Sequence, residues 1–181
     1  MKFYLNQIFR STTGAAENIK QDENGYFYYR YATSKNNKSS ANIARPMFWY
    51  KDVNLADKSL VCPAFICHSN PLQKDESINP WRDVIIQNEG IVYYNGDNKT
   101  AGVAPNYVER GKTATGNKKL ESLIELYFSK NIEDRKKAPP VLVFEQVKVG
   151  VKTKGYRQFI GLGIISSCDV RQQYDGDGKV F

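Results

Sequence analysis

Only one segment of this 181-residue chain has the apolar spacing of an amphipathic helix, and this limits the folds that the chain can adopt. Within residues 117–130 the apolar positions follow i, i+3, i+4, i+7 and i+8, and they are Leu120, Leu123, Ile124, Tyr127 and Phe128. Elsewhere the apolar residues form short runs rich in aromatic and β-branched side chains, which predict strands. The sequence therefore predicts an α+β fold in which about eight strands form a strongly curved or closed β-sheet, with this helix packed against it.

Several of the predicted strands have distinctive features. Residues 141–149, "VLVFEQVKV", open with a fully apolar run, which indicates burial on both faces. Residues 59–67, "SLVCPAFIC", contain Pro63, which favours an edge strand or a bulge. Residues 82–87, "RDVIIQ", and 91–94, "IVYY", surround "NEG", a pattern typical of a hairpin.

The three cysteines, Cys62, Cys67 and Cys168, are too few and too irregular for a disulfide framework, so we expect free thiols in a cytoplasmic protein. The segment "CPAFICH" also puts His68 beside Cys67, and a zinc site formed by these four residues is an alternative. Structural zinc sites usually use ligand pairs two to four residues apart, and the spacing here is longer. The sequence favours buried thiols and no metal.

Two loop-like segments concentrate positive charge. The chain has a formal net charge of +7 and a pI near 9.2, which favours a polyanionic partner. No apolar run is long enough to span a bilayer, which argues against a membrane protein. Residues 110–119 and 148–157 contain no acidic residue, and their cations are Arg110, Lys112, Lys118, Lys119, Lys148, Lys152, Lys154 and Arg157. Together with Lys99, these side chains are predicted to contact a phosphate backbone.

The sequence offers little that would support catalysis. It has a single histidine, no G-x-S-x-G elbow and no phosphate-binding loop, so we expect that this chain is not an enzyme and needs no cofactor. The alternative is a compact metal-dependent nuclease using Glu145 and Lys148 with Asp83 or Asp169. Such a site needs a further carboxylate on a nearby strand, and the preceding "APPVLV" provides none.

The order of elements from residue 81 onward resembles the SRA domain (SET- and RING-associated), which reads modified cytosine in DNA. The resemblance rests on Asp83, then "IVYYNGDN" (91–98), "GNKKL" (116–120), "PPVLVFE" (139–145) and "YRQFIGLGII" (156–165). It is nearest to the SRA-like N-terminal domains of modification-dependent restriction endonucleases of the AspBHI and MspJI type. The "NGDN" turn departs from the glycines of the eukaryotic SRA turn, and the first 70 residues match no motif of the family.

This resemblance implies a barrel of the SRA/PUA type and a single DNA-recognition domain over residues 1–181. The chain would then be a fragment that a nuclease domain follows in the parent restriction enzyme, and its partner would be double-stranded DNA carrying 5-methylcytosine or a related base. A related barrel that reads RNA or modified adenine is a further alternative.

The resemblance also suggests roles for individual residues, because a flipped cytosine needs an acceptor for its amino group and aromatic surfaces for its ring. Asp83 is the predicted acceptor and Tyr94 one stacking face. Trp81 is either a second wall of the pocket or part of the core. Tyr93 points away from Tyr94 in an alternating strand, so we expect it to pack into the core.

Overall fold

The computed structural model describes residues 3–11, 19–29, 47–50, 52–56, 59–69, 83–95, 115–152 and 155–169, with the backbone alone at 47–48 and 115–118. The chain forms two compact units. The first comprises Met1–Leu72 and Pro139–Gly163, and the second comprises Gln73–Ala138 and Ile164–Phe181. The single recognition domain expected over residues 1–181 stays a prediction.

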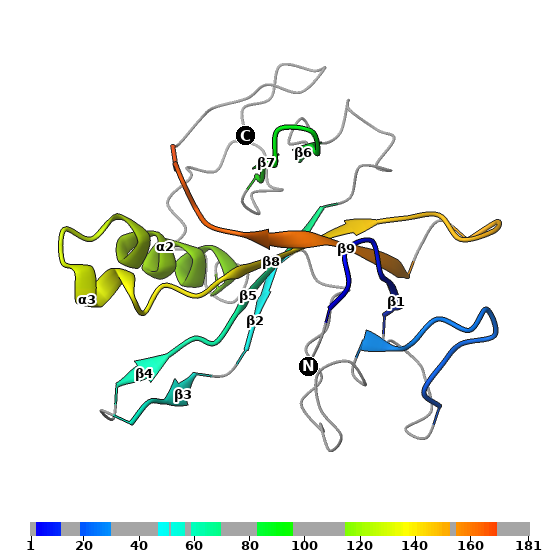
Figure 1. Ribbon diagram of the computed structural model, residues 1–181, viewed down its shortest axis with the longest axis horizontal. Helices are drawn as coiled ribbons and strands as arrows, with labels where there is room; N and C mark the ends of the chain where they lie inside the picture. The colour runs from blue at the N-terminus through cyan, green and yellow to red at the C-terminus, as the bar shows by residue number, and fades with distance from the viewer. Residues whose placement is uncertain are drawn as a thin grey trace. The chain divides into compact units, whose positions relative to one another are not determined.

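The first unit contains seven of the described strands. They are β1 (Ile8–Arg10), β2 (Met47–Trp49), β3 (Val53–Asn54), β4 (Leu60–Val61), β5 (Phe65–Ser69), β8 (Val141–Gln146) and β9 (Tyr156–Gly163). Five of them form one sheet in the order β1-β9-β8-β5-β2, while β3 and β4 pair only with each other (Figure 1). The neighbours β5 and β8 run parallel, and every other pair in the sheet is antiparallel.

The core of this unit is an aromatic cluster on one face of the sheet. Phe144 in β8 is fully buried, and its ring centroid lies 5.4 Å from Tyr29, 5.4 Å from Phe159 and 6.2 Å from Phe9. The Tyr29 hydroxyl is 2.9 Å from the Tyr50 hydroxyl, so this buried polar group is hydrogen-bonded. Edge-to-face ring pairs of this kind stabilise a core beyond the area that they bury.

Burial on both faces of the central strands confirms the prediction from the apolar run at 141–149. Every residue of β5 and residues 141–144 of β8 are buried. Pro63 lies between β4 and β5, so the strand predicted at 59–67 is divided into two. The reason is that proline cannot donate a backbone hydrogen bond to a neighbouring strand. The expectation of an edge strand there was wrong for β5, which lies between β8 and β2.

The sheet is not closed over the residues that the structure describes, in contrast to the predicted closed or strongly curved sheet. Among the described strands, the outer strands β1 and β2 each pair with one strand, β9 and β5, and a single parallel bridge links Arg10 of β1 to Tyr28. Alternating apolar residues predict that a strand exists but not which strand it joins. Here β3 and β4 pair with each other, and so do the two strands of the second unit, leaving five for the main sheet.

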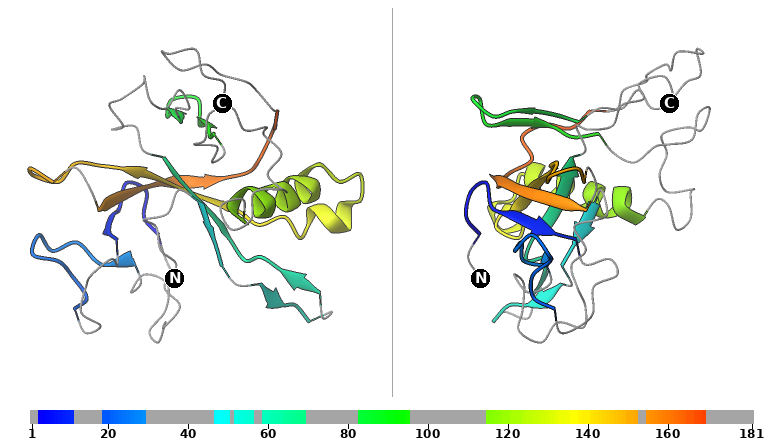
Figure 2. Two further views of the ribbon diagram at one scale, coloured as in Figure 1. Left: turned by 180° about the vertical axis from the view of Figure 1, so that it is seen from behind. Right: turned by 90° about the vertical axis from the view of Figure 1, so that its right-hand side faces the viewer.

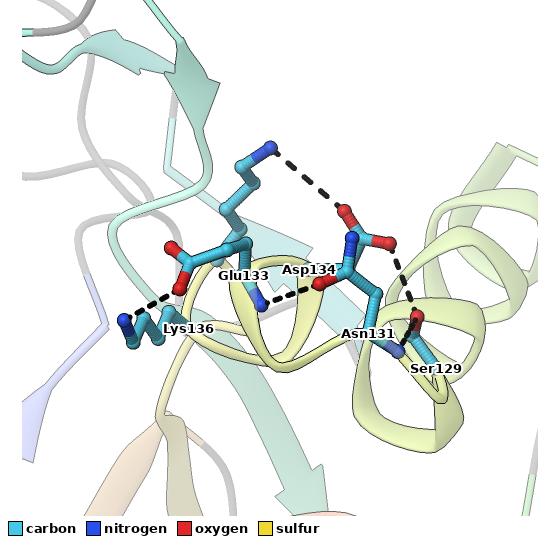
Figure 3. Close-up of polar contacts among 6 residues, drawn as sticks. Ser129, Asn131, Glu133, Asp134 and Lys136 are labelled. Atoms are coloured by element: carbon cyan, nitrogen blue, oxygen red, sulfur yellow. Dashed lines mark hydrogen bonds and ion pairs between the residues drawn. The ribbon is translucent and has the colours of Figure 1, made fainter.

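The second unit contains β6 (Val84–Ile86), β7 (Ile91–Tyr93), α2 (Thr115–Phe128) and α3 (Ile132–Arg135). The helix predicted at 117–130 is α2, displaced by two residues at each end. A short polar junction joins α2 to α3, where the Asn131 side chain accepts a 2.9 Å hydrogen bond from the Glu133 backbone N–H and caps α3 (Figure 3). Ser129 supports this turn by donating to Asp134. Within the described ranges, no helix has the length and apolar content needed to cross a membrane.

Candidate nucleic-acid interface

The predicted hairpin around "NEG" is present as β6 and β7 (Figure 2). Val84 pairs with Tyr93, Ile85 with Val92 and Ile86 with Ile91. The four residues between the strands form a tight turn, in which the Gly90 N–H donates to the Gln87 carbonyl at 3.2 Å. Gly90 has a φ of 65°, a left-handed conformation that glycine adopts without steric cost. Gly90 therefore favours a turn at this position of the hairpin.

The hairpin brings Asp83 and Tyr94 together. One step beyond the Val84–Tyr93 pair, the same register puts Asp83 opposite Tyr94, and both residues are half-buried. Asp83 Oδ1 accepts a 2.9 Å hydrogen bond from the backbone N–H of Asn95. This bond orients the carboxylate at the open end of the hairpin, because a charged acceptor on a backbone donor is a strong and directional contact.

The opposite face of the hairpin corrects one expectation. Tyr93 was expected in the core, but 55% of it is exposed, and its cross-strand partner Val84 is 47% exposed. Ile91 on the same face is 39% exposed. Tyr93 and Tyr94 lie on opposite faces of the hairpin, as predicted. However, Tyr94 lies on the more buried face and Tyr93 on the exposed one.

Five of the predicted contact residues lie outside the described residues: Trp81, Lys99, Arg110, Lys112 and Lys154. Lys118 lies within α2, where the backbone alone is described, and Lys119 is half-buried on the same helix. The roles predicted for all six of these cations and for Trp81 stay predictions.

The second basic segment is the connection between β8 and β9. Lys148 is exposed, and Val149 and Lys152 exchange two backbone hydrogen bonds of 3.0 Å, which close a two-residue turn. The Lys152 ammonium forms an ion pair with Glu23, and this pairing raises the lysine pKa. Part of the positive charge expected for a nucleic acid is thus balanced by an acid from a distant part of the sequence.

Arg157 was predicted to contact phosphate and was therefore expected at the surface, but it is buried. Only 6% of it is exposed, and its guanidinium donates from Nη1 to the Tyr156 carbonyl at 2.9 Å. Burial and the nearby Arg10 lower its pKa to about 10. The sequence around Arg157 did not indicate this burial. Arginine is rarely fully buried unless it is paired, so a position in a basic segment suggests exposure.

The single histidine is a buried polar group, which was not expected from the sequence. His68 in β5 is 6% exposed, and burial together with Arg157 lowers its pKa to about 3. Among the described side chains, neither ring nitrogen of His68 has a hydrogen-bond partner, nor does Nε of Arg157. The alternating strand pattern could have indicated burial, since position 68 lies two residues after the core residue Ile66.

The described residues show no group of three or more His, Cys, Asp or Glu side chains that could bind a metal ion. None of the three cysteines is in a disulfide, and Cys62 and Cys67 are buried, as expected, whereas Cys168 is exposed. Glu145, the acid of the alternative nuclease site, is half-buried in β8, and its burial raises the pKa of the carboxyl. Lys148 lies on the exposed connection that follows this strand.

Comparison with known proteins gives one family and two solved structures. Residues 63–176, more than half of the chain, match the family described as Restriction endonuclease AspBHI N-terminal. The MspJI restriction endonuclease in complex with a 27-mer oligonucleotide has a similar fold, with a TM-score of 0.76 and 24% identity over 99% of this chain. This chain spans 40% of that MspJI chain.

The DNA recognition domain of the cytosine modification-dependent restriction endonuclease LpnPI gives a TM-score of 0.49 and 17% identity, over 81% of this chain and 65% of that one. No curated protein matches the chain. The likeness to MspJI shows a shared fold of mostly strands with few helices.

Proposed function

The chain belongs to the family of AspBHI-type restriction endonuclease N-terminal domains, and from this membership we propose that it is a DNA-binding module that targets a nuclease to modified cytosine. The observation that carries the proposal is the family match over residues 63–176, which includes the β6–β7 hairpin with Asp83 and Tyr94. The module acts on double-stranded DNA in the cytoplasm and leaves strand cleavage to another part of the parent enzyme.

Asp83 is the residue that we propose for recognising the cytosine edge. A carboxylate accepts from the exocyclic amine of cytosine and repels the carbonyl that thymine has at the same position. The hydrogen bond from Asn95 N–H to Oδ1 supports this role because it holds the carboxylate in one orientation before DNA arrives. Tyr94, opposite Asp83 in the register, provides an aromatic surface for stacking.

Base flipping is part of the proposal, since it lets a protein inspect all edges of one base. Burying one methyl group contributes only about 0.8 kcal/mol, whereas unstacking a base costs a few kcal/mol. Selectivity for the methyl group therefore requires other, sequence-independent contacts that offset the free-energy cost of flipping the base. Exposed cations such as Lys148 provide such contacts with phosphate, so binding should weaken steeply as salt rises.

The test compares matched duplexes that contain cytosine or 5-methylcytosine at one position, using the parent chain and Asp83→Asn. Asparagine keeps an oxygen for the Asn95 N–H but presents an amino group toward the amine of the base, so the hairpin should persist while recognition fails. We expect the variant to bind the methylated duplex about 10- to 100-fold more weakly, as for the loss of one base-specific contact. The matched control is Glu125→Gln, which removes one negative charge from an exposed position of α2 and should leave binding unchanged.

Equal affinity of the parent chain for both duplexes, unaffected by Asp83→Asn, would overturn the proposal. A fluorescent base analogue placed next to the modified base provides an independent measurement, because flipping unstacks the analogue and raises its emission. The same analogue in an RNA duplex and beside a modified adenine separates the related modules that read those targets. Incubating this chain with plasmid and magnesium or manganese should give no cutting, which distinguishes it from the alternative nuclease.

A further inference from the structure

The turn between β8 and β9 exposes an apolar side chain at the centre of a basic segment. Val151 is 93% exposed, the highest value among the large apolar side chains of the described residues. Residues 146–155 contain Lys148, Lys152 and Lys154 and no acidic residue. A single exposed apolar residue is common on protein surfaces. A valine at the end of a projecting, positively charged hairpin is a more specific arrangement.

This turn is a defined structure that holds the valine outward. The two hydrogen bonds between Val149 and Lys152 close a loop of two residues, Gly150 and Val151. Gly150 has a φ of 57°, and Val151 does not have a positive φ, the pattern of a type II′ hairpin turn. Figure 1 shows the connection between β8 and β9 extending beyond the ladder of the five-stranded sheet. The ion pair between Lys152 and Glu23 joins this turn to the segment between β1 and β2.

We propose that this hairpin enters the major groove and that Val151 contacts the 5-methyl group of a thymine in the bound duplex. The inference rests on the proposed function and extends it to the sequence context of the target. It assigns a base-contacting residue to the first unit of the chain, separate from the Asp83 hairpin in the second unit.

The chemistry of the groove supports this assignment. The major groove is wide enough for a two-stranded β-ribbon, and thymine presents a methyl group on that edge, which apolar side chains contact. A valine at a turn has no donor or acceptor in its side chain, so it can distinguish bases only through such a methyl group. Lys148, exposed two residues before the turn, is positioned to bind phosphate beside the groove without reading sequence.

The experiment replaces the thymines of a methylated duplex one at a time with deoxyuridine, which removes only the methyl group. Binding of the parent chain and of Val151→Ser is measured by fluorescence anisotropy on this series of methylated duplexes. We expect deoxyuridine at one or two positions to weaken parent binding by about fourfold, the equivalent of about 0.8 kcal/mol for one methyl group. Val151→Ser should bind the thymine and deoxyuridine duplexes equally well.

Two controls identify the source of the effect. Val53→Ser changes another exposed valine of the first unit, in β3, and should retain the parent preference for thymine. Lys148→Gln should weaken binding to every duplex by a similar factor and leave the thymine preference unchanged.

The outcomes separate the two proposals. If the parent chain prefers 5-methylcytosine but no thymine position is sensitive to deoxyuridine, or if Val151→Ser keeps that sensitivity, the groove assignment is wrong and the proposed function stands. If the parent chain binds cytosine and 5-methylcytosine equally, the proposed function fails and the assignment of Val151 fails with it.

Discussion

The five-stranded sheet and the β6–β7 hairpin are built from the same kinds of residues, but only the sheet buries them. Ile66 and Phe144 in the sheet are fully buried, whereas Val84 and Tyr93 in the hairpin are 47% and 55% exposed. Burial of a large apolar side chain contributes about 1.5–3 kcal/mol, and a half-exposed one contributes correspondingly less. The sheet therefore provides most of the packing stability, and the hairpin has side chains available for contacts with a ligand.

The difference extends to polar groups. In the hairpin, the Asp83 carboxylate is hydrogen-bonded to a backbone N–H at an open end. In the sheet, both ring nitrogens of the buried His68 and Nε of the buried Arg157 have no hydrogen-bond partner among the described residues. We expect changes in the sheet to alter the stability of the protein and changes in the hairpin to alter what it binds.

The largest effect should come from the centre of the aromatic cluster. Phe144→Ala removes a fully buried ring with neighbours on several sides, and we expect a loss of about 3–5 kcal/mol in the free energy of unfolding, measured by urea denaturation. The matched change in the hairpin is Tyr93→Ala, expected to cost less than about 1 kcal/mol because the ring is more than half exposed. Similar losses for the two variants would show that the hairpin is as well packed as the sheet.

The buried histidine should make the sheet sensitive to acid. The pKa of His68 is about 3 in the folded chain and 6.5 when unperturbed, so the unfolded chain binds more protons between these values. Stability is therefore fully present above pH 6.5 and falls as pH decreases toward 3, by up to about 1.4 kcal/mol per pH unit.

His68→Leu removes this titration, and because neither ring nitrogen has a partner in the described part of the chain, stability at pH 7 should be unchanged or higher. Unfolding curves of parent and variant between pH 4 and 7 provide the measurement. Parallel pH profiles for the two proteins would contradict the burial of a neutral histidine.

The smallest expected effect concerns Glu23. This residue belongs to the first unit, which contains the five-stranded sheet, but we expect it to influence DNA binding. Glu23→Gln releases Lys152 from its ion pair, and since both side chains are largely exposed, the melting temperature should hardly change. DNA affinity should rise by about two- to fivefold at low salt, with a salt dependence steeper by about one counterion. Unchanged affinity and slope would show that Lys152 does not reach the phosphate backbone.

Sequence patterns predicted the local elements better than their partners. The apolar run at 141–149 indicated a buried strand, and "NEG" located the β6–β7 turn, because both properties depend on neighbouring residues. The parallel pairing of β5 with β8 could not be predicted, since alternation does not encode which strand lies alongside.

The candidate site shows the same limit. Alternation separated Tyr93 from Tyr94 but not the covered face from the exposed one, which depends on segments distant in sequence. Arg157 was assigned to the surface from its charge, whereas its partner in the ladder, Gln146, is itself buried. Asp83 lies opposite Tyr94 because of the register of the β6–β7 hairpin, which is a local property.

The parallel pairing of β5 and β8 has a consequence for how members of this family can diverge. Phe65 pairs with Val141 and Ser69 with Glu145, so residues 70–140 form an insertion between two adjacent strands of one ladder. Closing a longer loop costs little, about 0.6 kcal/mol for each doubling of its length. Evolution can therefore lengthen, shorten or replace the segment that contains Asp83 while β5 and β8 stay constant. We expect related chains to vary in length mainly between these two strands, so that new target preferences arise by exchange of one segment on a retained ladder.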